Sequence, residues 1–214
     1  EPFDEAARTL RGLVEKSVER RLMADVPVGT FLSGGIDSTI ITAIAASKRL
    51  PEKTNAYTIG FNETKYDERT FAARAASAIN QRTGGGIVHM ERVVNPGDFT
   101  LLEKLCAHCG EPYADASILP TARLSEFAAS GVKVALSGDG ADEIFCGYER
   151  YLALRWASRF SLLPGFLQRP LLKAASGLIP DGGERTLSGR LRRFLRVMAA
   201  TKEQRYFTLL ESSS

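Results

Sequence analysis

The sequence lacks the features that mark several large classes of protein. It has three cysteines in 214 residues, no signal-peptide pattern and no apolar run long enough to cross a bilayer. We therefore expect reduced thiols and a cytoplasmic location rather than a disulfide framework or a membrane anchor. An excess of one charge is also absent, because 28 basic residues stand against 25 acidic ones. A net charge of +3 argues against a nucleic-acid or membrane partner and favours a small-molecule site.

What the chain does contain is an alternation of short apolar runs with stretches of helical periodicity. The apolar runs predict strands over 26–32, 55–61, 86–90 and 132–136. Helical spacing predicts helices over 4–25, 38–46, 66–82, 98–109 and 121–130. Apolar strands that alternate with helices predict an α/β fold, a doubly wound and mostly parallel sheet covered on both faces.

The last part of the chain has a different character. Beyond Tyr148 we find only helical runs, which Pro164, Pro170 and Pro180 are expected to break. We therefore predict one domain over 1–150 and the start of a helical subdomain over 151–214. The chain begins at Glu1 without a start methionine and ends in a run of serines, so we expect a piece of a longer protein.

Two glycine-containing loops, 33–38 and 137–143, directly follow predicted strands. The carboxyl ends of parallel strands lie at one edge of a sheet, so these loops should face one another. In the first loop Gly34 and Gly35 allow the backbone to approach an anion, and the hydroxyls of Ser33 and Ser38 can point into it. The spacing matches neither a Walker loop nor G-x-G-x-x-G. We interpret the first loop as a phosphate cradle.

The carboxylates of the two loops indicate a divalent cation. Asp37 would repel a phosphate unless a cation bridged the two, and Asp142 of the second loop can supply another ligand. Two aspartates at separate strand ends suit Mg²⁺, which takes few protein ligands beside phosphate oxygens. The alternative is a plain strand-to-helix turn with Asp37 or Ser38 as the N-cap. For one loop alone the two interpretations are equally good, whereas both loops together favour the site.

The first loop has the S-G-G-x-D-S signature of ATP pyrophosphatase-type enzymes, and further segments agree with it in order and spacing. These segments are 21–29, 57–61, 66–68, 111–115, 136–143 and 147–148. Together they resemble the synthetase domain of the glutamine-dependent asparagine synthetase family over roughly residues 5 to 151. The resemblance implies the adenine-nucleotide α-hydrolase type of Rossmann-like fold.

The resemblance also implies roles for individual residues. ATP would be bound by Leu32, Ser33, Gly34, Gly35, Asp37, Ser38, Ile59, Gly60, Ser137 and Gly138. Among these, Leu32, Ile59 and Gly60 would line the adenosine pocket. The residues implied in catalysis are Asp37, Asp139 and Asp142, of which Asp37 and Asp142 would bind Mg²⁺.

The implied reaction is the activation of aspartate as β-aspartyl-AMP with release of pyrophosphate. Ammonia from glutamine would then form asparagine. The ammonia would come from an N-terminal glutaminase domain, which this chain lacks, and the resemblance leaves a homodimer open.

One departure bears on the substrate. Some family members have Thr-Thr-x-Arg where this chain has residues 114–120, so the substrate-binding arginine has no counterpart. A β-lactam synthetase or another amide ligase of natural-product or polysaccharide synthesis therefore remains an alternative. A nucleotide-binding module without turnover is a second alternative. A tRNA-thiolating enzyme is disfavoured, because it needs catalytic cysteines and a nucleic-acid surface.

Several other residues have plainer interpretations than a functional one. The segment 106–109 resembles half a zinc site, but without a second pair we expect buried helix thiols. For His89 we favour a structural or rim role, and for Asp67 an N-cap. The arginines of 190–196 are predicted to form a solvated helix face. Trp156 is predicted to pack in a core or between domains.

Overall fold

The computed structural model describes residues 2–63, 67–94, 99–110, 115, 117–179, 187–201, 204, 205 and 207. The chain divides into two compact units, Glu1–Asp139 and Gly140–Ser214. The sequence placed this boundary after residue 150. In the structure the second unit begins at Gly140, whose φ of 86° starts a short helix, so it takes in a helix that the sequence had assigned to the first domain.

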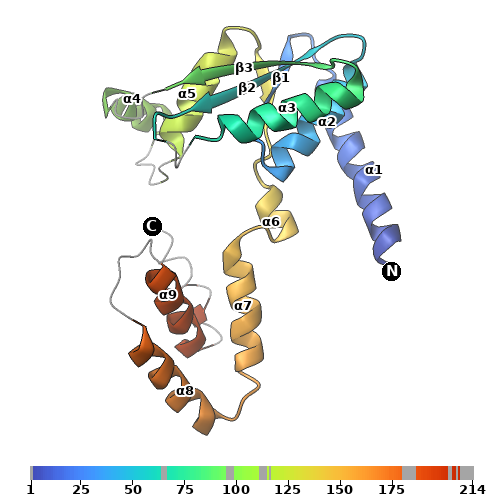
Figure 1. Ribbon diagram of the computed structural model, residues 1–214. Coiled ribbons are helices and arrows are strands. Elements are labelled where there is room, and N and C mark those ends of the chain that lie inside the picture. The colour runs from blue at the N-terminus through green and yellow to red at the C-terminus, as the bar shows by residue number, and fades with distance from the viewer. Residues whose placement is uncertain are drawn as a thin grey trace. The chain divides into compact units, whose positions relative to one another are not determined.

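The first unit is a parallel sheet with helices on both faces (Figure 1). Its elements are α1 (Phe3–Leu22), β1 (Val28–Phe31), α2 (Ile36–Arg49), β2 (Thr54–Gly60), α3 (Arg69–Thr83), β3 (Ile87–Val93), α4 (Phe99–Cys109), α5 (Ile118–Ala129) and β4 (Val134–Leu136). The strand order is β3-β2-β1-β4 and all three pairings are parallel. The predicted α/β class and doubly wound sheet are confirmed.

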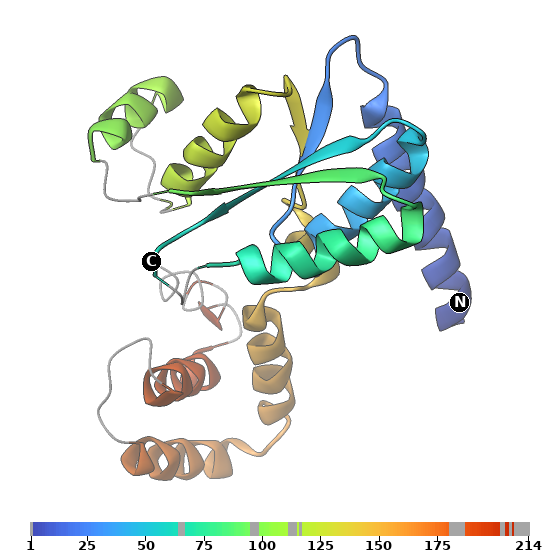
Figure 2. The same cartoon turned by 45° about the horizontal axis from the view of Figure 1, so that its top comes forward.

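One face of the sheet packs against α2 and α3. Ala56 of β2 and Ile87 of β3 meet Ala46 of α2 and Ala72 and Ile79 of α3 in one buried cluster. Small alanine side chains dominate it, which lets both helices lie close to the strands. Figure 2 shows α3 running alongside β2 and β3 on this face.

The opposite face packs against α5. Tyr57, the neighbour of Ala56 in β2, points to this face because successive strand residues alternate between faces. Its ring meets Phe127 of α5 edge to face, with 5.3 Å between the ring centroids. Ala128 and Val132 complete the buried part of the cluster. The sheet therefore buries apolar side chains on both faces, although β3 also carries His89, Glu91 and Arg92.

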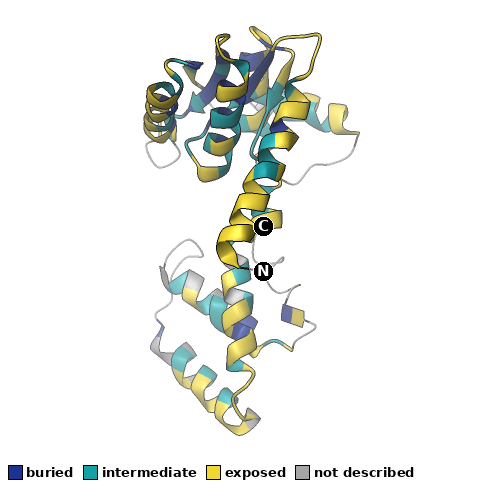
Figure 3. Ribbon diagram, turned by 90° about the vertical axis from the view of Figure 1, so that its right-hand side faces the viewer, coloured by how far each residue is buried: buried dark blue, intermediate teal, exposed yellow. Residues whose placement is uncertain are grey.

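The second unit consists, in its described part, of helices. They are α6 (Ala141–Phe145), α7 (Glu149–Phe160), α8 (Gly165–Leu178) and α9 (Leu187–Ala199). Ala157 of α7 and Val197 of α9 are fully buried and together form one small cluster. Figure 3 shows far fewer buried residues in these helices than in the sheet of the first unit.

Two details of the second unit differ from the sequence predictions. Pro170 was expected to break a helix, but it lies inside α8. It is the sixth residue of α8, past the first-turn N–H groups that lack an acceptor, so it removes the backbone donor to the Phe166 carbonyl. Phe166 and Pro170 are both exposed, so water can reach that carbonyl. Trp156 was expected to pack in a core or between domains; it is 51% exposed and so does not lie in a core, and Arg159 Cζ is 5.6 Å from the centroid of its ring. Pro164 precedes α8 as its N-cap, whereas Pro180 lies outside the described residues.

Candidate active site

The two glycine loops leave the sheet at neighbouring strand ends. β1 and β4 are paired in parallel, with Thr30 opposite Leu136. From β1 the chain proceeds through α2 to β2 on one side, while β4 lies on the other side. The crevice beyond the carboxyl ends of β1 and β4 is thus the switch point, where ligands bind in open α/β sheets. Loop 33–38 leaves β1 at this point, and loop 137–139 leaves β4 there (Figure 1).

The first loop is held by hydrogen bonds between its own serines. The hydroxyls of Ser33 and Ser38 lie 2.9 Å apart, and the Ser33 backbone N–H donates to Ser38 Oγ at 3.2 Å. The Gly35 N–H donates to Ser33 Oγ at 3.2 Å, and Ser38 Oγ can donate to the Gly35 carbonyl at 3.3 Å. These bonds close the loop into a tight turn ahead of α2. The serine hydroxyls therefore shape the cradle as well as lining it.

Gly34 shows why this turn requires glycine. Its φ is 84°, and an added Cβ would lie 2.4 Å from the Phe71 carbonyl carbon and 2.6 Å from the Ala72 nitrogen. The loop thus rests directly on the first turn of α3. Gly35 is the N-cap of α2, so the N–H groups of the first turn have no acceptor within the helix. A helix N-terminus of this kind attracts phosphate.

The second loop lies against the first turn of α2. A Cβ added to Gly138 would be 2.9 Å from both the Asp37 Cβ and the Ser38 nitrogen. The structure therefore brings loop 33–38 and residues 137–139 of the second loop together, as their places at the carboxyl ends of parallel strands led us to expect. Ser137 Oγ donates to Asp139 Oδ2 at 2.9 Å, and Asp139 is exposed. The hydroxyl of Ser137 thereby holds the Asp139 carboxylate at the mouth of the crevice.

Asp142 belongs to the second unit, in the first turn of α6. Its carboxylate lies against Gly147, where an added Cβ would displace it, and its carbonyl accepts from the Gly147 N–H at 3.0 Å. It remains a prediction that Asp142 and Asp37 bind the same Mg²⁺ ion.

The residues expected around adenosine lie at the ends of β1 and β2. Leu32 is 1% exposed and its side chain belongs to the α2–α3 cluster, so its backbone is the part nearest to any ligand. Ile59 is partly buried and packs in the α5 cluster. Gly60 is buried against the pair of Asp67 and Arg69, whose atoms would lie within 2.5 Å of an added Cβ.

Asp67 was predicted to be the N-cap of α3, but Glu68 takes that position and Asp67 lies one residue earlier. Its carboxylate accepts from the Arg69 backbone N–H at 3.2 Å and binds the Arg69 guanidinium at 2.7 Å. The hydrogen bond from that guanidinium holds the pKa of Asp67 below its ordinary value. Burial raises the pKa of the neighbouring Glu68. Tyr66, which the resemblance placed at the start of this helix, lies outside the described residues, as do residues 111–114.

The sequence did not single out Thr58, whose hydroxyl connects the loop to β3. Thr58 is 2% exposed, and its Oγ1 donates to the Leu32 carbonyl at 2.5 Å. The same oxygen is 2.8 Å from His89 Nε2, and His89 Nδ1 is 3.5 Å from Glu91 Oε1. Because the Thr58 proton goes to Leu32, His89 Nε2–H must donate to Thr58. The sequence predicted the strand itself, but not that a polar residue of it would bond to the neighbouring strand.

The structure also allows a test of whether the residues fit a divalent cation. Within the described residues, Asp37 makes no side-chain hydrogen bond or ion pair, so its carboxylate is available. The described part of the chain contains no group of three or more His, Cys, Asp or Glu side chains that could hold a metal alone. Mg²⁺ typically uses one or two carboxylates with phosphate oxygens and water, which suits a single carboxylate beside an anion cradle.

The cysteine segment differs from expectation. Cys106 is partly buried, whereas Cys109 and Cys146 are exposed, so the thiols are not the buried ones predicted. Cys109 is exposed because α4 makes few contacts with α5. Separately, none of the helices in the described part of the chain is long and apolar enough to cross a membrane.

Comparison with known proteins gave concordant matches. A family model described as asparagine synthase matches residues 9–213. Asparagine synthetase [glutamine-hydrolyzing] 1 of Bacillus subtilis is 33% identical over 180 residues, which is 84% of this chain and 27% of that protein. A putative asparagine synthetase [glutamine-hydrolyzing] of Mycobacterium tuberculosis is 35% identical over 199 residues, 92% of this chain and 28% of that protein. Amidase chyE of Penicillium rubens is 29% identical over 164 residues. The chain spans about a quarter of the length of these curated relatives.

Proposed function

Because the chain belongs to the asparagine synthase family, we propose that it is the synthetase part of a glutamine-dependent asparagine synthetase. The β-carboxylate of aspartate attacks the α-phosphorus of ATP, pyrophosphate leaves, and β-aspartyl-AMP forms. Ammonia then attacks the acyl carbon, and AMP leaves with asparagine as the product. The observation that carries this proposal is the contact of Gly138 with Asp37 and Ser38 at the switch point.

The pyrophosphate end of ATP is assigned to the first loop. Ser33, Gly34, Gly35 and Ser38 form this end of α2, where Gly34 and Ser38 present backbone N–H groups and the two serines present hydroxyls. The N–H groups of Ser33 and Gly35 donate to these hydroxyls and so hold the loop in place. Both the aligned peptide dipoles and the unpaired N–H groups favour a multiply charged anion there. Gly34 and Gly35 keep the approach open, because neither carries a Cβ. Adenosine is assigned to the adjacent strand ends at Leu32, Ile59 and Gly60.

The α-phosphate is assigned to the second loop. Gly138 lies beside the first turn of α2, so its backbone can approach the phosphorus that aspartate attacks. Ser137 orients the Asp139 carboxylate through its 2.9 Å hydrogen bond. Catalysis then depends on positioning and on charge stabilisation, with no protein nucleophile.

The cation site is assigned to Asp37 and Asp142. Bound there, Mg²⁺ would neutralise the charge that develops on the leaving pyrophosphate. Asp37 stands on the first turn of α2, next to the loop that receives the phosphates. Without a cation its charge would oppose ATP binding, which is the physical reason to assign it this role.

Two further parts of the proposal concern the longer protein. Ammonia is assigned to an N-terminal glutaminase domain of the full-length polypeptide, in keeping with the names of the relatives. Residues 1–150 are assigned to the ATP-using domain and 151–214 to the start of a helical subdomain.

A second candidate substrate class has one observation in its favour. Two fungal relatives carry the name amidase, at 29% identity over 164 residues. A natural-product amide ligase would use the same two loops with another carboxylate. The two candidates differ in the acid that is adenylated, so one assay can separate them.

The test is isotope transfer with the full-length protein. Aspartate labelled with ¹⁸O in its β-carboxylate is incubated with ATP, Mg²⁺ and glutamine, and AMP is analysed by mass spectrometry. Attack of the carboxylate on the α-phosphorus requires one ¹⁸O to appear in AMP when the amide forms. Formation of ADP, or of AMP without label, would contradict adenylation of aspartate. Pyrophosphate release with other carboxylates but not with aspartate would favour the natural-product ligase.

A further inference from the structure

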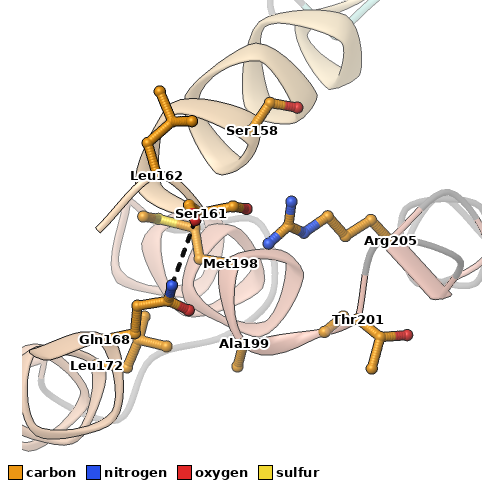
Figure 4. Close-up of a pocket in the computed structure, with 10 residues that line it drawn as sticks. Ser158, Ser161, Leu162, Gln168, Leu172, Met198, Ala199, Thr201 and Arg205 are labelled. Atoms are coloured by element: carbon orange, nitrogen blue, oxygen red, sulfur yellow. Dashed lines mark hydrogen bonds between the residues drawn. The ribbon is translucent and has the colours of Figure 1, made fainter. Parts of the chain in front are cut away.

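The second unit contains a pocket that the proposed reaction does not use. It has a volume of about 700 Å³ and is lined by residues of α7, α8, α9 and the segment after α9 (Figure 4). Its wall is apolar on one side and polar on the other, with Leu162, Leu172, Met198, Ser158, Thr201 and Arg205 among the lining residues. None of the described residues that line it is acidic.

Among the described residues that line this pocket, Arg205 is the charged one. It is 8% exposed, and Figure 4 shows its guanidinium pointing into the pocket between α7 and α9. Its Nε is buried and has no hydrogen-bond partner among the described residues. Its backbone N–H donates to the Thr201 carbonyl at 3.0 Å, which fixes the start of the side chain.

Two other polar side chains of the pocket, Gln168 and Ser161, are already engaged. Gln168 Nε2 donates to the Leu163 carbonyl at 2.6 Å and to the Ser161 carbonyl at 3.5 Å. Ser161 Oγ donates to the Ala157 carbonyl at 2.8 Å. Neither group brings the negative charge that a guanidinium needs. A guanidinium stays protonated in proteins, so burial cannot be relieved by loss of its proton.

Burying a permanent cation without an anion is strongly unfavourable. We therefore infer that this pocket binds a carboxylate on the Arg205 guanidinium. The planar fork of guanidinium donors matches the two oxygens of a carboxylate. A single buried cation balances a monoanion, whereas a phosphate dianion would leave a charge in an apolar cavity. The apolar wall of Leu162, Leu172 and Met198 suits the hydrocarbon part of such a group.

Two sources can provide this carboxylate. One is an Asp or Glu side chain from another part of the full-length polypeptide, and the other is a free small carboxylic acid. Both make the same bidentate contact, but only the free acid exchanges with solution. An added carboxylate therefore stabilises the protein only in the second case.

The experiment measures the thermal unfolding midpoint of the full-length protein. Sodium butyrate is the probe, butyramide is its uncharged isostere, and sodium chloride at equal ionic strength is the salt control. The variants are Arg205→Met, which keeps the length of the side chain without the charge, and Arg205→Lys, which keeps the charge without the fork. Arg155→Met on the exposed face of α7 is the matched control.

A free carboxylate predicts that butyrate, but not butyramide, raises the midpoint by about 2 °C or more in the wild type and not in Arg205→Met. A carboxylate of the polypeptide predicts no effect of butyrate. In that case Arg205→Met lowers the midpoint well below that of Arg155→Met, with Arg205→Lys between them. The inference is overturned if the unfolding midpoint of Arg205→Met equals or exceeds that of the wild type and butyrate has no effect. This result would mean that Arg205 is an unpaired buried cation, whose removal stabilises the protein.

A second measurement applies if Arg205→Met does not accumulate in a folded form. Phenylglyoxal modifies accessible and unpaired guanidinium groups, and mass spectrometry locates the modified arginines. The native full-length protein is expected to react at Arg155 and to be protected at Arg205, either throughout or only with butyrate present. Equal reaction of the two arginines with and without butyrate would also overturn the inference.

Discussion

The two units of the chain reach their stability in different ways. The first buries two clusters on opposite faces of a sheet. The described residues of the second form one small buried cluster, while Leu162 and Phe166 are 85% and 76% exposed. In the first unit the candidate site is built from backbone and glycine at strand ends. In the second the noteworthy group is one buried side chain, Arg205. Substitutions should therefore act through backbone geometry in the first unit and through side-chain charge in the second.

The largest effect is expected at Asp37, a residue of the first unit where the charge of the side chain should matter more than backbone geometry. Asp37→Asn keeps the shape and the helix-start compatibility of the side chain but removes the charge that would hold Mg²⁺. Loss of several kcal/mol of charge stabilisation corresponds to a roughly 10²-fold or larger fall in aspartate-dependent pyrophosphate release. Steady-state assays of the full-length protein at varied Mg²⁺ measure this. Asp4→Asn on the exposed start of α1 is the control. Unchanged rate and Mg²⁺ dependence in Asp37→Asn would leave only a structural role for this residue.

Gly34 gives the sharpest test of backbone control. Gly34→Ala forces a Cβ onto the backbone of Phe71 and Ala72 at a φ of 84°, so we expect a loss of about 3 kcal/mol in unfolding free energy. Gly12→Ala is the matched control, because α1 leaves nothing within 4 Å of the new methyl group. There we expect a gain of up to about 1 kcal/mol from helix propensity. Urea unfolding measures both. Equal effects of the two substitutions would mean that loop 33–38 yields easily to a side chain.

The same difference between the units decides how much of the structure the sequence could predict. Alternation of apolar runs with helical spacing predicted the sheet and its flanking helices, because both faces of the sheet bury apolar side chains. The position of both loops at the carboxyl ends of parallel strands was enough to predict that loop 33–38 meets loop 137–139. In the second unit the helix break expected at Pro170 is absent, and Trp156 does not lie in a core. Their surroundings depend on how helices pack, which local periodicity does not specify.

The rest of the candidate site could not be predicted, because it depends on contacts across strands. The bond from Thr58 to Leu32 joins residues 26 positions apart, and the bond to His89 spans 31 positions. In the sequence Thr58 is one more residue of a β-prone run, and its neighbours give no sign that its hydroxyl makes these hydrogen bonds. Arg205 was hidden for another reason, since its burial arises from the approach of α7 and α9. Such pairings become visible only once the register and the helix packing are known.

A smaller effect is expected where a side chain supports the backbone of the first unit. Thr58→Val keeps the shape of the side chain but leaves the buried Leu32 carbonyl without the 2.5 Å hydrogen bond. The expected loss is about 1–3 kcal/mol of unfolding free energy, with weaker binding of a non-hydrolysable ATP analogue because the loop begins at the next residue. Thr58→Ser retains the hydroxyl and is the control. Denaturant unfolding and isothermal titration measure the two quantities. Should valine and serine behave alike in both, the hydroxyl does not position the loop.

The smallest effect concerns pH and separates the two histidines of the chain. Burial lowers the pKa of His89, with the Glu91 carboxylate acting in the opposite direction. The folded state therefore binds a proton less readily than the unfolded state, whose pKa lies near 6.5. The contribution of His89 to stability is complete above about pH 6.5, and it is lost as the pH falls through the unfolded-state pKa toward the lower folded-state pKa.

The test compares His89→Gln with the wild type between pH 7 and pH 5. Glutamine offers an N–H donor to Thr58 but does not titrate, so the variant should lose less stability on acidification, by about 1 kcal/mol or less. His108→Gln on the exposed side of α4 should follow the wild type. Urea unfolding at each pH gives the comparison. If His89→Gln lost as much stability as the wild type, the acid sensitivity of the first unit would have to come from its carboxylates. The stability of the first unit would then not depend on the protonation of His89.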